Sequence, residues 1–243
     1  MYRLYLTIES TQRAIARKDI YEKMAILIRD FISKNKKGLH AEHYKRSFSY
    51  YCFSNPTPME HDEVYRKGRR YTVELRSLDA EFKDLRYYTG LETDDLRLVS
   101  VSSGKLFFGP TGALRTVTPM YFKTKRIQTD DYRVEVEHRL RENIIFRYVK
   151  SGMNSVDDLE WLRENLVRNI KLYTKVITIP FPSKRLDNGK SLLYHCIHAD
   201  VYFHENEPGY EVQKILYAGG IGMSTSNGFG MMDEKEDKYR ATP

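Results

Sequence analysis

Two neighbouring stretches at the start of the chain have different hydrophobic periods, and this change of period constrains the fold more than any other feature. Residues Tyr2 to Ile8 alternate, with β-branched and aromatic side chains, which predicts a strand. The apolar residues that follow recur at the spacing of one helix face: Ile20, Met24, Leu27, Ile28, Phe31 and Ile32. We therefore expect a strand and then a helix, with Asp19 as its N-cap and Gly38 at its end.

The rest of the first half continues in an order that is typical of one small fold. Aromatic and β-branched residues predict strands at 48–53 and 70–75, and a short helix and a last strand follow at 79–87 and 96–101. The resulting order, β-α-β-β-α-β, is the split βαβ arrangement of a ferredoxin-like domain. We assign this domain to residues 1–103.

The second half repeats this order less clearly after the turn-rich stretch from Gly104 to Gly112. The patterns predict strands at 116–122, 175–181 and 192–203, a helix over 159–170 and a short helix at 212–217. Residues 130–150 keep no single period, so we interpret them as a partly helical insertion. The sequence thus predicts an α+β protein of two tandem ferredoxin-like domains, the second spanning residues 113–243.

Composition excludes several classes of protein. Hydrophobic residues make up 41% of the 243 residues, which is enough for a buried core. The formal net charge of +7 favours an anionic partner. Cys52 and Cys196 are too few for a disulfide scaffold. The N-terminal residues lack the apolar region of a signal peptide, and the longest apolar run, Met24 to Ile28, is too short for a membrane span. We expect a cytoplasmic protein with no membrane partner.

Glycine is concentrated near the C-terminus. Five of the 14 glycines lie between Gly219 and Gly230, in a stretch that also contains Ser224, Thr225 and Ser226. Glycine allows main chain to approach a ligand closely, and consecutive amides with nearby hydroxyls can bind phosphate oxygens. The spacing does not fit a dinucleotide-binding turn, and this stretch contains no Gly-Lys-Ser/Thr of a P-loop. We therefore predict a loop that contacts an anion.

The same stretch resembles a known signature. Gly-Ile-Gly, a Ser/Thr spacer, Gly-Phe-Gly and then Met231-Met232 resemble the C-terminal loop of the RAMP superfamily, the CRISPR-associated RNA-binding proteins. Thr118-Pro119 and residues 162–169 are also similar to the family, and the whole chain most resembles the endoribonuclease that cuts CRISPR repeat transcripts. The resemblance implies RNA bound between two ferredoxin-like domains and cleavage without metal or cofactor. It implies RNA contacts at Gly219, Gly220, Gly222, Ser224, Thr225, Ser226, Gly228, Phe229 and Gly230.

A basic segment after the first helix carries the candidate chemistry. Cleavage of RNA without metal needs a proton acceptor, a proton donor and a cation for the phosphate charge, and imidazole with Lys or Arg supplies them. The family pattern favours His40 as the catalytic imidazole, with His43 as its rival or partner and with Lys45 or Arg46 as the cation. Tyr21 on the first helix is a further candidate, for holding a 2′-hydroxyl or a phosphate; the alternative is a half-buried helix tyrosine.

Further basic residues lie between two predicted strands and are candidate phosphate contacts: Arg66, Lys67, Arg69 and Arg70. His195 and His198 would point to opposite faces of one strand, so we expect no shared metal site there. We predict a metal-independent endoribonuclease whose partner is the repeat transcript. Two alternatives stay open: a non-catalytic guide-RNA-binding subunit of a CRISPR effector complex, and a metabolic enzyme or sensor on the same fold. The sequence also leaves open a homodimer.

Overall fold

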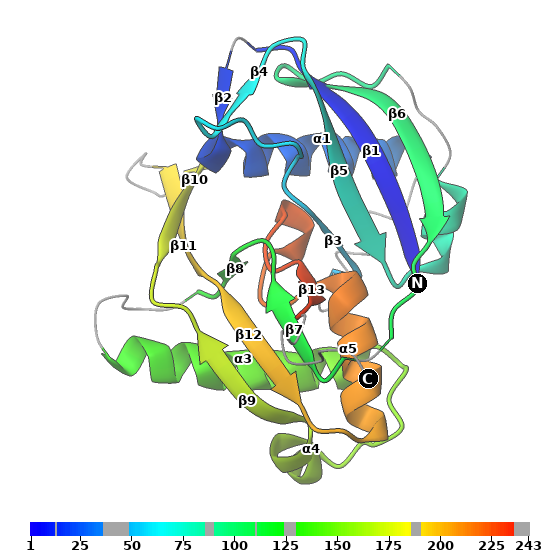
Figure 1. Ribbon diagram of the computed structural model, residues 1–243, viewed down its shortest axis with the longest axis vertical. Helices are drawn as coiled ribbons and strands as arrows, with labels where there is room; N and C mark the ends of the chain where they lie inside the picture. The colour runs from blue at the N-terminus through cyan, green and yellow to red at the C-terminus, as the bar shows by residue number, and fades with distance from the viewer. Residues whose placement is uncertain are drawn as a thin grey trace, which may run out of the picture.

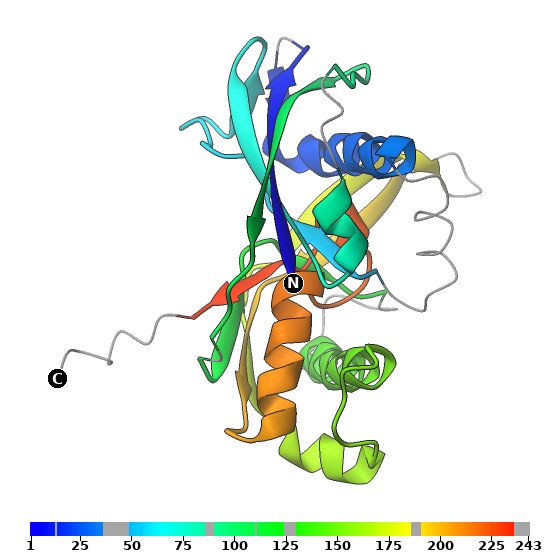
Figure 2. The same cartoon turned by 90° about the vertical axis from the view of Figure 1, so that its right-hand side faces the viewer.

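The computed structural model describes residues 1–12, 14–35, 49–85, 90–109, 111–123, 130–185 and 191–235. Its elements form two four-stranded antiparallel sheets that lie one above the other in Figure 1. The strands of the upper sheet come from residues 2–105, and those of the lower sheet come from residues 113–234. Figure 2 shows α1 (Ile20–Asn35) and α3 (Asp130–Lys150) on the same side of the two sheets.

The first sheet confirms the predicted ferredoxin-like order. Its strands lie in the order β3 (Tyr51–Phe53), β5 (Arg70–Ser77), β1 (Tyr2–Ser10) and β6 (Leu96–Lys105). The apolar residues of β1 are buried against the apolar face of α1, as their alternation requires. The second helix is reduced to the 3₁₀ turn η2 (Ala80–Asp84). A small ribbon of β2 (Ala14–Ala16) and β4 (Val64–Arg66) lies beside the sheet, and η1 (Arg17–Asp19), which contains Asp19, leads into α1.

The second sheet has the same order of elements. Its strands lie in the order β13 (Met232–Glu234), β7 (Ala113–Thr116), β12 (Ala199–Phe203) and β9 (Val167–Leu172). The helix after β7 is α3, and the helix after β12 is α5 (Glu207–Gly219). The fold is therefore α+β with two tandem ferredoxin-like units, as predicted.

The sequence analysis interprets residues 130–150 as a partly helical insertion, and this interpretation is wrong. These residues form the long first helix of the second unit. Val136, Leu140, Ile144 and Tyr148 are all buried and lie four residues apart, which places them along one face. Phe146 obscured this period in the sequence because it is a large apolar side chain on the exposed side. These four residues give the helix a buried apolar face.

Other predicted elements also differ from the structure. The helix predicted over 159–170 ends at Asn165 as α4 (Leu159–Asn165), and β9 begins at Val167, because Ile170 pairs with Val201 of β12. The strand predicted at 116–122 divides at Pro119 into β7 and β8 (Met120–Tyr121). The strand predicted at 192–203 divides at His198 into β11 (Ser191–Ile197) and β12, which belong to different sheets.

A hairpin connects the two units. β10 (Ile177–Arg185) and β11 form a three-stranded sheet with β8, and Figure 1 shows this hairpin extending from the lower sheet up to η1 and the start of α1. Its buried side chains Ile179, Phe181, Tyr194 and Cys196 belong to the same hydrophobic cluster as the core of the first unit. The two units therefore share a core and are not independent modules. Among the described residues, no helix is both long enough and apolar enough to cross a bilayer.

Candidate nucleic-acid interface

The glycine-rich stretch forms a tightly packed loop between α5 and β13. It contains the 3₁₀ turn η3 (Thr225–Asn227). Gly230 has a φ of +65°, and a Cβ there would lie 1.8 Å from the carbonyl oxygen of Ile221. A Cβ on Gly228 would lie 2.6 Å from the ring of Phe53 in the first unit. These glycines are therefore needed for packing, whatever the loop binds.

Most amides of this loop form hydrogen bonds inside the protein. The amide of Ile221 donates to Gly230 O at 2.8 Å, and the amide of Gly230 donates to Pro119 O at 3.0 Å. The amide of Gly222 donates to Asn143 Oδ1 at 2.9 Å. The part of the loop that reaches the surface is its tip, 223–227, although Thr225 within it is buried. We had expected the glycine amides themselves to contact RNA; the structure leaves the tip, with Ser224 and Ser226, as the accessible portion.

One buried arginine ties the loop to the rest of the molecule. Arg147 of α3 is 2% exposed, and its guanidinium donates to Gly219 O at 3.3 Å and to Gly222 O at 2.8 Å. It also donates to Ser49 O at 3.4 Å. Burial lowers the pKa of Arg147 to about 10, so the side chain is still a cation at neutral pH. The loop therefore lies beside Ser49, the first described residue after the segment that carries His40 and His43.

The predicted catalytic residues divide into two groups. His40, His43, Lys45 and Arg46 lie outside the described residues, in a segment that joins Asn35 of α1 to Ser49. Tyr21 is described, and it is 4% exposed, with its ring stacked on Phe229 of the glycine-rich loop at 5.3 Å between centroids and 4° between planes.

The environment of Tyr21 limits its chemistry. Burial raises the pKa of its phenol to about 12, against a smaller lowering by a hydrogen bond with Asn55. The phenol is therefore fully protonated at neutral pH. Tyr121, Phe181 and Tyr194 also lie around Phe229. The stack thus joins α1 to the loop and to the hairpin, and the catalytic role of Tyr21 stays a prediction.

The predicted phosphate contacts lie together on the connection between β4 and β5. Arg66, Lys67, Arg69 and Arg70 are all exposed there. Two of them already form ion pairs, Arg66 with Asp62 and Arg69 with Glu60 at 2.7 Å. Exposed pairs of this kind are weak and exchange readily for a phosphate. RNA contact at this turn stays a prediction.

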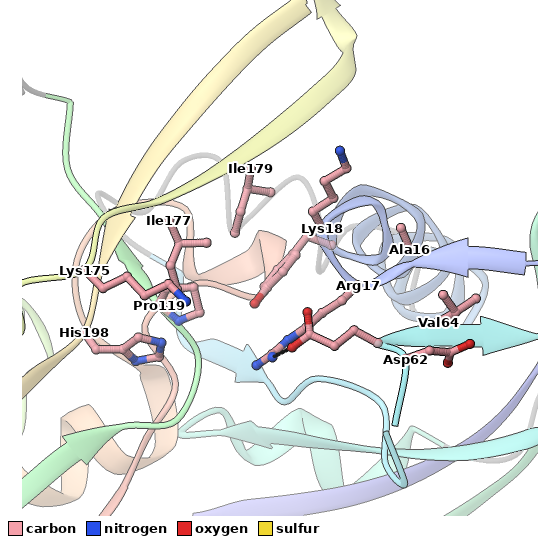
Figure 3. Close-up of a pocket in the computed structure, with 12 residues that line it drawn as sticks. Ala16, Arg17, Lys18, Asp62, Val64, Pro119, Lys175, Ile177, Ile179 and His198 are labelled. Carbon is pink, nitrogen blue, oxygen red and sulfur yellow. Dashed lines mark hydrogen bonds and ion pairs between the residues drawn. The ribbon is translucent and has the colours of Figure 1, made fainter. Parts of the chain in front are cut away.

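A pocket between the two units was missed by the sequence analysis. It has a volume of about 380 Å³. Figure 3 shows Arg17 and Lys18 of η1 on one side and Ile177, Ile179 and His198 on the other. No local pattern could have revealed it, because its walls come from segments that are far apart in the sequence and meet only through the β10–β11 hairpin.

His198 is held in place at the edge of this pocket. Its Nδ1 lies 3.0 Å from Thr116 Oγ1 and 3.1 Å from Thr116 O. Burial lowers the pKa of His198. His195 instead contacts Thr178 Oγ1, so the two histidines have different surroundings. Among the residues that the structure describes, no three His, Cys, Asp or Glu side chains come together as a metal site.

Comparisons with known proteins concern the fold. No protein-family model matches the sequence, and no curated protein matches it. A solved structure of the "CRISPR associated protein Cas6" is 17% identical, with a TM-score of 0.61 over 97% of this chain and 99% of that one. "An RAMP protein binding different RNA substrates" is 12% identical, with a TM-score of 0.65 over 97% of this chain and 100% of that one.

A third structure, of a Cas6-related gene from Pyrococcus furiosus, is 14% identical, with a TM-score of 0.64 over 97% of this chain and 99% of that one. The similarity spans both units in all three structures. The chain therefore has the whole-length fold of the Cas6 and RAMP proteins, which confirms the fold that the glycine-rich loop implied.

Proposed function

We propose that this protein binds CRISPR repeat transcripts and cleaves them by internal attack of a 2′-hydroxyl, without a metal ion. The observation that carries the proposal is the position of the glycine-rich loop. Tyr21–Phe229 stacking joins it to the first helix, and Arg147 joins it to Ser49. Ser49, the first described residue after the histidine segment, therefore adjoins the loop whose sequence resembles the RAMP signature, and the start of α1 packs on the same loop.

The chemistry assigned to each group follows from its type. An imidazole, His40 or His43, takes the 2′-hydroxyl proton, and an acid protonates the departing 5′-oxygen. Lys45 or Arg46 stabilises the extra negative charge that develops on the phosphate. The products are a 2′,3′-cyclic phosphate and a 5′-hydroxyl. The whole-length match to Cas6 and RAMP structures supports the fold on which the proposal rests.

Single-turnover cleavage of a repeat RNA tests the proposal. Cleavage should persist in EDTA and stop when the attacking 2′-hydroxyl is replaced by hydrogen. His40→Ala and His43→Ala, alone and together, identify the catalytic imidazole. If the two histidines are redundant, activity is lost completely only in the double variant. The exposed His138 offers a matched control, because His138→Ala removes an imidazole from the outer side of α3. Cleavage that requires a divalent metal would contradict the mechanism.

The second candidate is a non-catalytic RNA-binding subunit of an effector complex. It is favoured by the fact that the loop tip and the β4–β5 turn need no imidazole to bind RNA. Under this alternative, the purified protein binds RNA in a salt-sensitive manner but the His variants change nothing. In either case we place the protein in a reducing compartment such as the cytoplasm, because Cys52 and Cys196 are both free thiols.

A further inference from the structure

The pocket between η1 and the β10–β11 hairpin combines three kinds of surface. Ile177, Ile179 and Pro119 supply apolar walls, and Tyr21 lines the same space. Lys18 and Lys175 lie exposed at its edge. His198 adds a polar group on the side of the hairpin (Figure 3). The volume of about 380 Å³ lies within the range of about 300–1,000 Å³ that is usual for small-molecule sites.

The charges of the pocket favour an anion at its edge. Its two carboxylates are both engaged by arginines: Glu63 by Arg17 at 2.8 Å, and Asp62 by Arg66. Within the described part of the chain, none of the ion pairs involves Lys18 or Lys175. The cationic charge that is not already compensated is therefore that of the two lysines.

His198 has one ring nitrogen with an assigned role. Thr116 O lies 3.1 Å from Nδ1, and a carbonyl oxygen can only accept a hydrogen bond. The hydroxyl of Thr116, which also lies 3.0 Å from Nδ1, donates its own proton to Ala199 O at 3.3 Å. The neutral ring therefore carries its proton on Nδ1 and presents Nε2 as an acceptor. The lowered pKa keeps the ring neutral near pH 7. An acceptor in this position matches an N–H on the edge of a nucleobase and does not match a phosphate oxygen.

We propose that this pocket binds one unstacked nucleotide of single-stranded RNA. The base lies against Ile177 and Ile179 and donates an N–H to His198 Nε2, while its phosphate lies near Lys18 and Lys175. Unpaired bases of RNA are commonly recognised in this way, by an apolar surface and hydrogen bonds to the base edge. This inference rests on the proposed RNA-binding function and adds to it a site that selects a base.

Binding of labelled single-stranded RNA to the full chain tests the site. The probes are 10-residue oligonucleotides of A, C or U, measured by fluorescence anisotropy over a series of salt concentrations. Lys18→Ala and Lys175→Ala should each weaken binding by about 3- to 10-fold and lower the salt slope by about 0.7, whereas the control Lys214→Ala on α5 should not.

Two variants separate the binding role of His198 from its packing role. Asparagine can keep a donor near Thr116 O while removing Nε2, so His198→Asn should fold normally and yet reduce the largest affinity ratio among the three oligonucleotides by about threefold or more. His198→Gln, which places an amide near the position of Nε2, should retain part of the selectivity.

The outcomes are distinguishable. Wild-type protein that binds none of the oligonucleotides and no repeat RNA contradicts the proposed function and this inference with it. Wild-type protein that binds RNA, while the two lysine variants match Lys214→Ala and His198→Asn keeps the full selectivity, contradicts the pocket alone. Competition by the free nucleoside monophosphates at similar concentrations would show that a free nucleotide is the ligand, and it would overturn the assignment to RNA.

Discussion

Replacement of Gly230 by alanine tests the packing of the glycine-rich loop. The new Cβ would lie 1.8 Å from Ile221 O, whereas real Cβ contacts are essentially never shorter than 3.0 Å. The main chain must therefore move by about 1 Å or more, a shift that disturbs the hydrogen bonds between Ile221 N and Gly230 O and between Gly230 N and Pro119 O. It also displaces the neighbouring Phe229.

The magnitude follows from these losses. The left-handed φ of +65° costs an alanine about 1–2 kcal/mol. Two weakened hydrogen bonds add about 0.5–1.5 kcal/mol each. Partial loss of Phe229 packing adds a fraction of the about 3–5 kcal/mol of a full Phe→Ala change. We expect the free energy of unfolding to fall by roughly 3–6 kcal/mol.

Gly152 provides a matched control, because its φ of +69° is similar but its Cβ position is open. Gly152→Ala should lower the free energy of unfolding only by the cost of the left-handed backbone conformation, about 1–2 kcal/mol. Urea unfolding followed by circular dichroism measures both variants under one set of conditions. If the two free energies of unfolding agree within about 1 kcal/mol, the loop is not packed as the structure shows.

Three more predictions concern buried groups. Arg147→Met leaves Gly219 O, Gly222 O and Ser49 O without their donor, and should lower the free energy of unfolding by roughly 3–5 kcal/mol in the same assay, at about 1–3 kcal/mol for each buried acceptor. The pKa of His198 is lowered from its ordinary 6.5, so near and below that pH the unfolded chain binds a proton that the folded protein does not. Stability should fall from about pH 7.5 to about pH 5.5, and it should fall less in His198→Asn; equal slopes would contradict the burial of the ring. Burial raises the pKa of Cys52 to about 12 and also raises that of Cys196, so neither thiol should react with iodoacetamide at about pH 8 until urea unfolds the protein, as mass spectrometry would show.

The sequence predicted the elements whose pattern is local. β1 and α1 follow from alternation and from a helical stripe, because each buries one face against the other. The error at α4 has the opposite cause. Leu162, Leu166 and Ile170 keep a helical spacing, but Ile170 pairs with Val201 of β12, and sheet pairing determines its conformation.

The candidate site was predictable only in part. The cluster of glycines indicated the position of the loop. The sequence could not show that these glycines are needed for close packing inside the protein, such as that of Gly228 against Phe53. Phosphate binding and tight packing favour the same residue type, so composition does not separate them. The pocket gave no signal, because Lys18 and His198 are distant in sequence and share a space only once the hairpin contacts η1.

The loop and the pocket depend on one another through the contact between the two units. Phe229 packs on Tyr21 of the first unit and on Tyr194 of the hairpin, so it fixes the position of the hairpin relative to α1. The pocket has one wall on η1, directly before α1, and the other on the hairpin. A change at the loop that leaves both units folded should therefore alter the width of the pocket. Such a change should affect base selectivity even if the loop itself never contacts the RNA, because the residues that select the base are positioned by the packing of the loop.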